Sequence, residues 1–81
     1  MQREIERRVS EQLARTLAIE PNADPRKIID IQIKQERERL ILAAERFDNQ
    51  GNDQAAELAE MLAEEWLPYL AKQLKSRGNS N

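Results

Sequence analysis

The sequence predicts an all-α protein, a bundle-like domain of three helices. Apolar residues recur with helical spacing along most of the chain, and only two glycines and three prolines interrupt it. Charged residues make up 35% and aromatic residues 4% of the 81 residues, which is typical of exposed helices and not of a β-sandwich. The prolines and glycines separate helices that we place at about residues 2–19, 25–50 and 53–75.

The first helix, residues 2–19, has one apolar face. This face consists of residues spaced four apart, which share about a third of the helix circumference: Ile5, Val9, Leu13 and Leu17. Pro21 ends the helix, because a proline pushes the residue before it out of the helical region.

The second helix, residues 25–50, begins at a clear signal. Asp24 is a favourable N-cap, and Pro25 suits the first helical position, where no hydrogen bond is lost. Two apolar stripes follow. The first contains Ile29, Ile33, Leu40, Ala43, Ala44 and Phe47; the second contains Ile28, Ile31 and Leu42, joined by Gln35. Either this helix lies between two neighbours of its own chain, or another chain covers one stripe.

The acid Glu36 falls within the first apolar stripe. A carboxylate buried there would pair with a nearby arginine or mark an interface, because an unpaired buried charge is very costly.

The third helix, residues 53–75, follows a short turn at Gly51, so the second and third helices should pack as an antiparallel hairpin. Its broad apolar face contains Ala55, Leu58, Ala59, Leu62, Trp66, Tyr69 and Leu70, while Met61 falls on the opposite, polar face. Pro68 predicts a kink or a break. We expect residues 1–75 to form a single domain and residues 76–81 to be a disordered tail.

Charge is distributed unevenly along the chain. The formal net charge is −2, but residues 48–65 contain six acids and no base, whereas residues 66–81 contain three bases and no acid. A protein without an overall basic field attracts nucleic acid poorly. The composition therefore argues against nucleic acid as a partner.

Residue types needed for common chemistry are missing. The chain has no cysteine and no histidine, which excludes disulfides, a serine–histidine arrangement and the usual zinc ligands. No glycine-rich phosphate loop is present. The acids of the third helix (Glu57, Glu60, Glu64 and Glu65) are typical of a solvated helix face. We predict that the protein is not an enzyme and uses neither a metal nor another cofactor.

The chain shows no targeting signal. Its charged start is not a secretion signal, and no apolar run is long enough to span a membrane. We therefore expect a cytoplasmic protein, and the lack of cysteine fits a reducing compartment.

Residues 40–68 resemble a single tetratricopeptide-repeat hairpin. Leu40, Ala43, Ala44 and Phe47 match the first helix of the repeat, Gly51 the turn, Ala56 and Ala63 the small residues of the second helix, and Pro68 the closing proline. Asp53 and Glu60 depart from the pattern, because large aromatic residues are usual there. The resemblance implies a protein-binding role, although small-residue packing in any tight hairpin produces the same spacing.

We interpret the chain as a small protein–protein interaction module, an adaptor or regulator that binds another protein and itself. A chain of this length buries a thin core, and self-association is a common remedy. We expect a homodimer with Ile28, Ile31, Gln35 and Leu42 in its interface. Met61, Trp66 and Tyr69 are the expected anchors for a foreign partner, since Trp and Tyr are favoured at interfaces. Alternatively, Trp66 packs with Phe47 in the core.

Two other functions fit the sequence. A small DNA-binding regulator would use the arginines of the first helix, Arg3, Arg7, Arg8 and Arg15, although interleaved glutamates neutralise their field. An assembly factor of a larger particle, including a viral one, would also be short, charged and helical.

Overall fold

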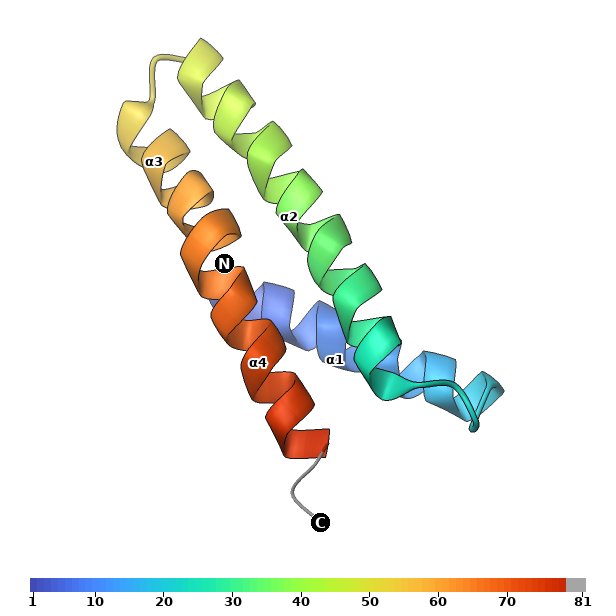
Figure 1. Ribbon diagram of the computed structural model, residues 1–81. Coiled ribbons are helices and arrows are strands. Elements are labelled where there is room, and N and C mark those ends of the chain that lie inside the picture. Colours follow the sequence, from blue (N-terminus) through green and yellow to red (C-terminus); the bar gives the residue numbers. More distant parts are fainter. Residues whose placement is uncertain (79–81) are drawn as a thin grey trace.

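The computed structural model describes residues 1–78 and confirms an all-α fold of three packed helical segments. The first two segments are α1 (Gln2–Ile19) and α2 (Pro25–Asn49). The third consists of α3 (Asp53–Met61), a π turn η1 (Leu62–Trp66) and α4 (Leu67–Gly78). Figure 1 shows α2 antiparallel to the third segment, with α1 crossing both near the end away from the hairpin turn. No strand occurs within the described residues.

Both ends of α1 and the start of α2 lie at the predicted residues, and α2 ends at Asn49, one residue before the predicted end. The backbone N–H of Glu20 donates to the Thr16 carbonyl at 2.8 Å, after which α1 stops before Pro21. The Asp24 side chain accepts a hydrogen bond of 3.0 Å from the backbone N–H of Arg26, which caps the start of α2. Local sequence therefore determines both boundaries.

The turn between α2 and α3 is a Schellman motif. Gly51 takes a positive φ of 77°, its N–H donates to the Asp48 carbonyl at 3.0 Å, and the N–H of Asn52 donates to the Phe47 carbonyl at 2.8 Å. The Asn52 side chain also accepts a bond of 3.3 Å from the N–H of Ala55 and so caps α3. One short turn thus ends one helix, begins the next and reverses the chain.

Pro68 neither breaks the third segment nor leaves it a regular α-helix. A proline cannot donate to the carbonyl four residues earlier and its ring clashes with that carbonyl. The π turn of η1 lies directly before it, with the N–H of Leu67 donating to the Leu62 carbonyl five residues back. This wider turn accommodates Pro68 while the helix continues.

The helix after Pro68 is longer than predicted. α4 ends at Gly78 and not at residue 75, so the first part of the predicted tail is helical. The remainder of that tail, residues 79–81, lies outside the described residues.

The core forms where α1 crosses the hairpin and continues between α2 and the third segment. It contains the buried residues Ile5, Val9, Ile29, Leu40, Ala44, Ala59, Leu62, Ala63, Leu67, Leu70 and Leu74. Alanines are buried on both sides of the hairpin and allow α2 and the third segment to approach each other closely in the half next to the hairpin turn. They are Ala44 on α2 and Ala56, Ala59 and Ala63 on the third segment. Since α2 packs against α1 on one side and the third segment on the other, it is the central helix.

Replacing Gly51 should destabilise the fold through backbone conformation alone. An added Cβ meets no atom within 4 Å, so the cost comes from the positive φ. We expect Gly51→Ala to lower the free energy of unfolding by about 1 kcal/mol in urea denaturation, with a smaller loss for Gly51→Asn, which tolerates this conformation better. The control Gln50→Ala, at a residue with helical φ, should change little. Equal stability of Gly51→Ala and wild type would contradict the Schellman turn.

Candidate functional site

An exposed apolar stripe runs along the outer side of the third segment. Leu58 is 47% exposed, Met61 50% and Tyr69 58%, although each is a large apolar or aromatic residue. Exposed Glu65 lies between Met61 and Tyr69 along the helix. We call Leu58, Met61, Glu65 and Tyr69 the outer stripe. Such groups of exposed apolar residues often mark interaction sites.

The π turn brings the outer stripe into line. In a regular α-helix Tyr69 would lie about 80° around the axis from Met61, because each residue turns the helix by about 100°. The extra residue in η1 rotates α4 back by about 100°, which leaves Tyr69 within about 20° of Met61. The backbone irregularity at Pro68 therefore shapes the surface.

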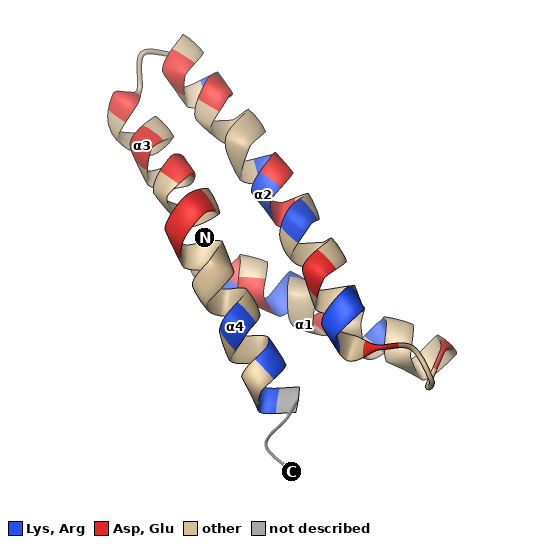
Figure 2. Cartoon of the chain, viewed as in Figure 1, with Lys and Arg blue, Asp and Glu red and all other residues tan. Residues whose placement is uncertain are grey.

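The residues beside the outer stripe are acidic at its α3 end and basic at its α4 end. The α3 end is acidic, whereas Lys72, Lys75 and Arg77 make α4 basic; Figure 2 shows this change of sign along the third segment. The acids at the α3 end are Asp53, Glu57, Glu60, Glu64 and Glu65.

Two of the three basic residues of α4 form ion pairs with other helices. Lys75 pairs with Asp30 of α2, and Arg77 lies 3.6 Å from Glu6 of α1. Lys72 is exposed and makes no ion pair within the described part of the chain.

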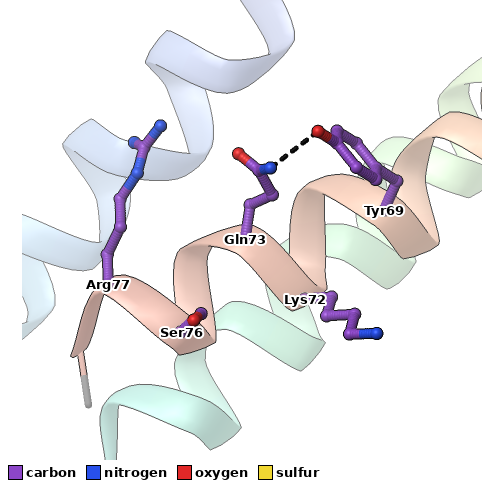
Figure 3. Close-up of a pocket in the computed structure, with 5 residues that line it drawn as sticks. All are labelled: Tyr69, Lys72, Gln73, Ser76 and Arg77. Atoms are coloured by element: carbon purple, nitrogen blue, oxygen red, sulfur yellow. Dashed lines mark hydrogen bonds between the residues drawn. The ribbon is translucent and has the colours of Figure 1, made fainter. Parts of the chain in front are cut away.

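A shallow hollow of about 520 Å³ lies on α4 at the lower end of the outer stripe. It is lined by Tyr69, Lys72, Gln73, Ser76 and Arg77 (Figure 3). Gln73 Nε2 donates to the Tyr69 hydroxyl at 2.6 Å, which fixes the ring at the edge of the hollow. In Figure 3 Arg77 extends toward α1, while Lys72 points away from it on the opposite side of α4.

The expected partner anchors differ in their accessibility. Met61 and Tyr69 are exposed, whereas Trp66 is half-buried and packs against the core. Trp66 does not pack with Phe47, because it lies about 20 Å along the third segment from the hairpin turn, at a rise of 1.5 Å per residue, while Phe47 is next to that turn.

The expected dimer residues on α2 do not form one exposed surface. Ile28 is 8% exposed and so offers little area to a partner. Ile31 and Leu42 are 56% and 58% exposed, and Gln35 is exposed between them. We call Ile31, Gln35 and Leu42 the α2 face.

Leu58, like Tyr69, is more exposed than its place in the helical pattern predicts. The helical pattern put it on the apolar face of the third helix, but its side chain lies on the outer stripe. It sits at the margin of the apolar arc and is 47% exposed.

The buried carboxylate of Glu36 is held by two arginines. Glu36 is 3% exposed. Arg8 of α1 donates to its two oxygens at 2.7 and 3.1 Å, and Arg39 donates at 3.3 Å. The predicted pairing with an arginine is thus confirmed. The hydrogen bond to Glu36 raises the pKa of Arg8, as does the Glu36 charge, against an opposing effect of burial. Stabilisation from a raised basic pKa is lost only as the pH rises through it, far above neutral.

The arginines suggested for DNA binding are partly engaged elsewhere. Arg7 pairs with Glu11 at 2.9 Å, and Arg8 binds Glu36. Only Arg3 and Arg15 of that set make no ion pair within residues 1–78. Within the same range, no group of acids could hold a metal ion, and no helix has the length and apolarity needed to cross a membrane.

Removing Arg8 should destabilise the protein more than removing its neighbour. Arg8→Met leaves Glu36 buried with one weaker partner, and we expect a loss of about 2 kcal/mol in chemical denaturation. Arg7→Met breaks an exposed pair and should cost no more than about 0.5 kcal/mol. The double variant Arg8→Met/Glu36→Met should recover much of the loss. Equal effects of the two single variants would show that the buried pair does not hold α1 in place.

Comparisons with known proteins found no match to a protein-family model, to a curated protein or to a solved structure.

Proposed function

We propose that the protein is a helical protein–protein interaction module, an adaptor or regulator that docks a helix of another chain on its outer stripe. The carrying observation is the exposure of Leu58, Met61 and Tyr69 in line along one helical segment. Tyr and Met are enriched at protein interfaces, and amphipathic helices bind through anchors spaced three to four residues apart.

The stripe suits a partner of this kind for a second reason. The core beneath it is packed, with Ala59, Leu62, Leu67 and Leu70 buried, so the anchors stand on a preorganised surface. Preorganisation lowers the entropy lost on binding.

Other observations favour the same class of function. The resemblance of residues 40–68 to a tetratricopeptide-repeat hairpin implies protein binding, and those residues form the α2–α3 hairpin and the π turn. A cytoplasmic location is part of the proposal, because the cysteine-free composition fits a reducing compartment. The DNA-binding alternative gains no support, since two of its four arginines are paired with glutamates.

A charge placed on the outer stripe should abolish partner capture while the fold persists. We expect tagged Met61→Glu to lose proteins that the tagged wild type retains from native lysate, because a desolvated carboxylate opposes an apolar contact. Mass spectrometry would identify them, and circular dichroism would check the helical content. Ile31→Glu, a matched change on the α2 face, should retain the same proteins. Loss of capture by Ile31→Glu alone would transfer the function to the α2 face.

A further inference from the structure

We propose that the helix docked on the outer stripe is the α3–η1–α4 segment of a second copy, running antiparallel to the first. The proposal rests on the proposed function and names its partner. It predicts a twofold symmetric dimer in which the same surface of each copy is buried.

Charge complementarity argues for a second copy. The α3 end of the segment is acidic and the α4 end is basic, so an antiparallel copy places each acidic end beside a basic one. With the twofold axis at Glu65, Glu57 and Lys72 lie eight and seven residues from the axis, so Glu57 of one copy comes within about one residue of the level of Lys72 of the other. Lys72 has no ion pair among the described residues of its own chain. A parallel copy would instead set like charges side by side, which disfavours that arrangement.

The apolar anchors match in the same register. With the twofold axis at Glu65, Met61 of one copy meets Tyr69 of the other, because both lie four residues from the axis. Leu58, seven residues from the axis, comes level with Lys72 and next to Gln73, both of which line the hollow in Figure 3. One arrangement therefore pairs the exposed anchors and the opposite charges together.

The α2 face lacks this polarity. Its flanking charges alternate in sign along the helix: Asp30, Lys34, Glu38, Arg39, Glu45 and Arg46. The α2 face therefore has no acidic end and basic end for an antiparallel copy to complement, so the charge pattern favours the outer stripe.

Glu65 at the axis opposes the dimer. It meets Glu65 of the other copy, and like charges directly opposite are unfavourable. The dimer should therefore be weak in the wild type, and Glu65→Gln should tighten it several-fold in sedimentation equilibrium.

Cross-linking tests the arrangement, because the chain contains no cysteine and each engineered thiol is unique. Single cysteines replace exposed polar residues, so the apolar anchors stay intact. With a short bismaleimide, Glu65→Cys should cross-link to itself across the axis. Gln54→Cys and Ser76→Cys, each eleven residues from Glu65, should cross-link with one another in a mixture and remain monomeric alone. Gln35→Cys on the α2 face is the matched control and should remain monomeric.

Other outcomes overturn the proposal in distinguishable ways. Cross-linking of Gln54→Cys to itself would indicate a parallel dimer, and cross-linking at Gln35→Cys alone would place the second copy on the α2 face. A monomer for every variant would exclude self-association. If Met61→Glu still loses captured proteins in that case, the proposed function stands with a foreign partner. If capture is also unchanged, both fail.

A charge-reversal cycle supplies an independent readout. Glu57→Lys and Lys72→Glu should each weaken the dimer by about five-fold at low salt, because each sets like charges opposite one another. The double variant should restore wild-type affinity, since the pair is re-formed with reversed signs. Glu45→Lys, an exposed change on α2, should have no effect. Loss of affinity in the double variant equal to the sum of the single losses would contradict the pairing.

Discussion

The burial of Glu36 under α1 depends on its ion pair with Arg8. Glu36 is the one buried charged residue of the described chain and lies on the central helix. A buried carboxylate is stable there only because Arg8 of α1 and Arg39 in the next turn of α2 donate hydrogen bonds to it. Ile5 and Val9, buried on either side of Arg8 along α1, add the apolar contact. Specific charge pairing and non-specific burial thus act at the same crossing point.

That crossing point has consequences for the rest of the surface. Because α1 crosses the hairpin instead of running along it, it covers only the part of the hairpin away from the turn (Figure 1). In the half of the hairpin next to the turn, α2 packs against α3 through small buried residues such as Ala44 and Ala59, and α1 does not cross this half. Leu58 and Met61 lie in this part of the molecule and remain accessible.

Pro68 connects backbone chemistry to the proposed function. The missing N–H and the bulk of its ring require a local adjustment, and the π turn provides one without ending the helix. The same turn changes the phase of α4 relative to α3, which aligns Tyr69 with Met61. The proposed docking surface therefore depends on a proline that itself makes no contact with the partner in the arrangement that we propose.

Signals that act over a few residues predicted their part of the fold well. Asp24 with Pro25, Gly51 with Asn52, and Pro21 each determine a helix end through nearby hydrogen bonds or steric exclusion. The pairing of Glu36 with an arginine also followed from the cost of burying a charge, although the identity of Arg8 did not. The sign change between α3 and α4 was visible in the residue order, because it lies along a single segment.

The burial of individual apolar residues depends on contacts between distant segments. Ile28 and Leu58 both lie at the margins of apolar helix faces, and helical periodicity alone predicts the same degree of burial for both. In the folded chain Ile28 is only 8% exposed, whereas Leu58 is 47% exposed. The sequence by itself determined the helices, the ends that carry a cap, a proline or a turn glycine, and the polarity of charge, since these depend on near neighbours. Only the tertiary structure decided which apolar residues remain exposed, because burial depends on which helices pack against one another across long stretches of sequence.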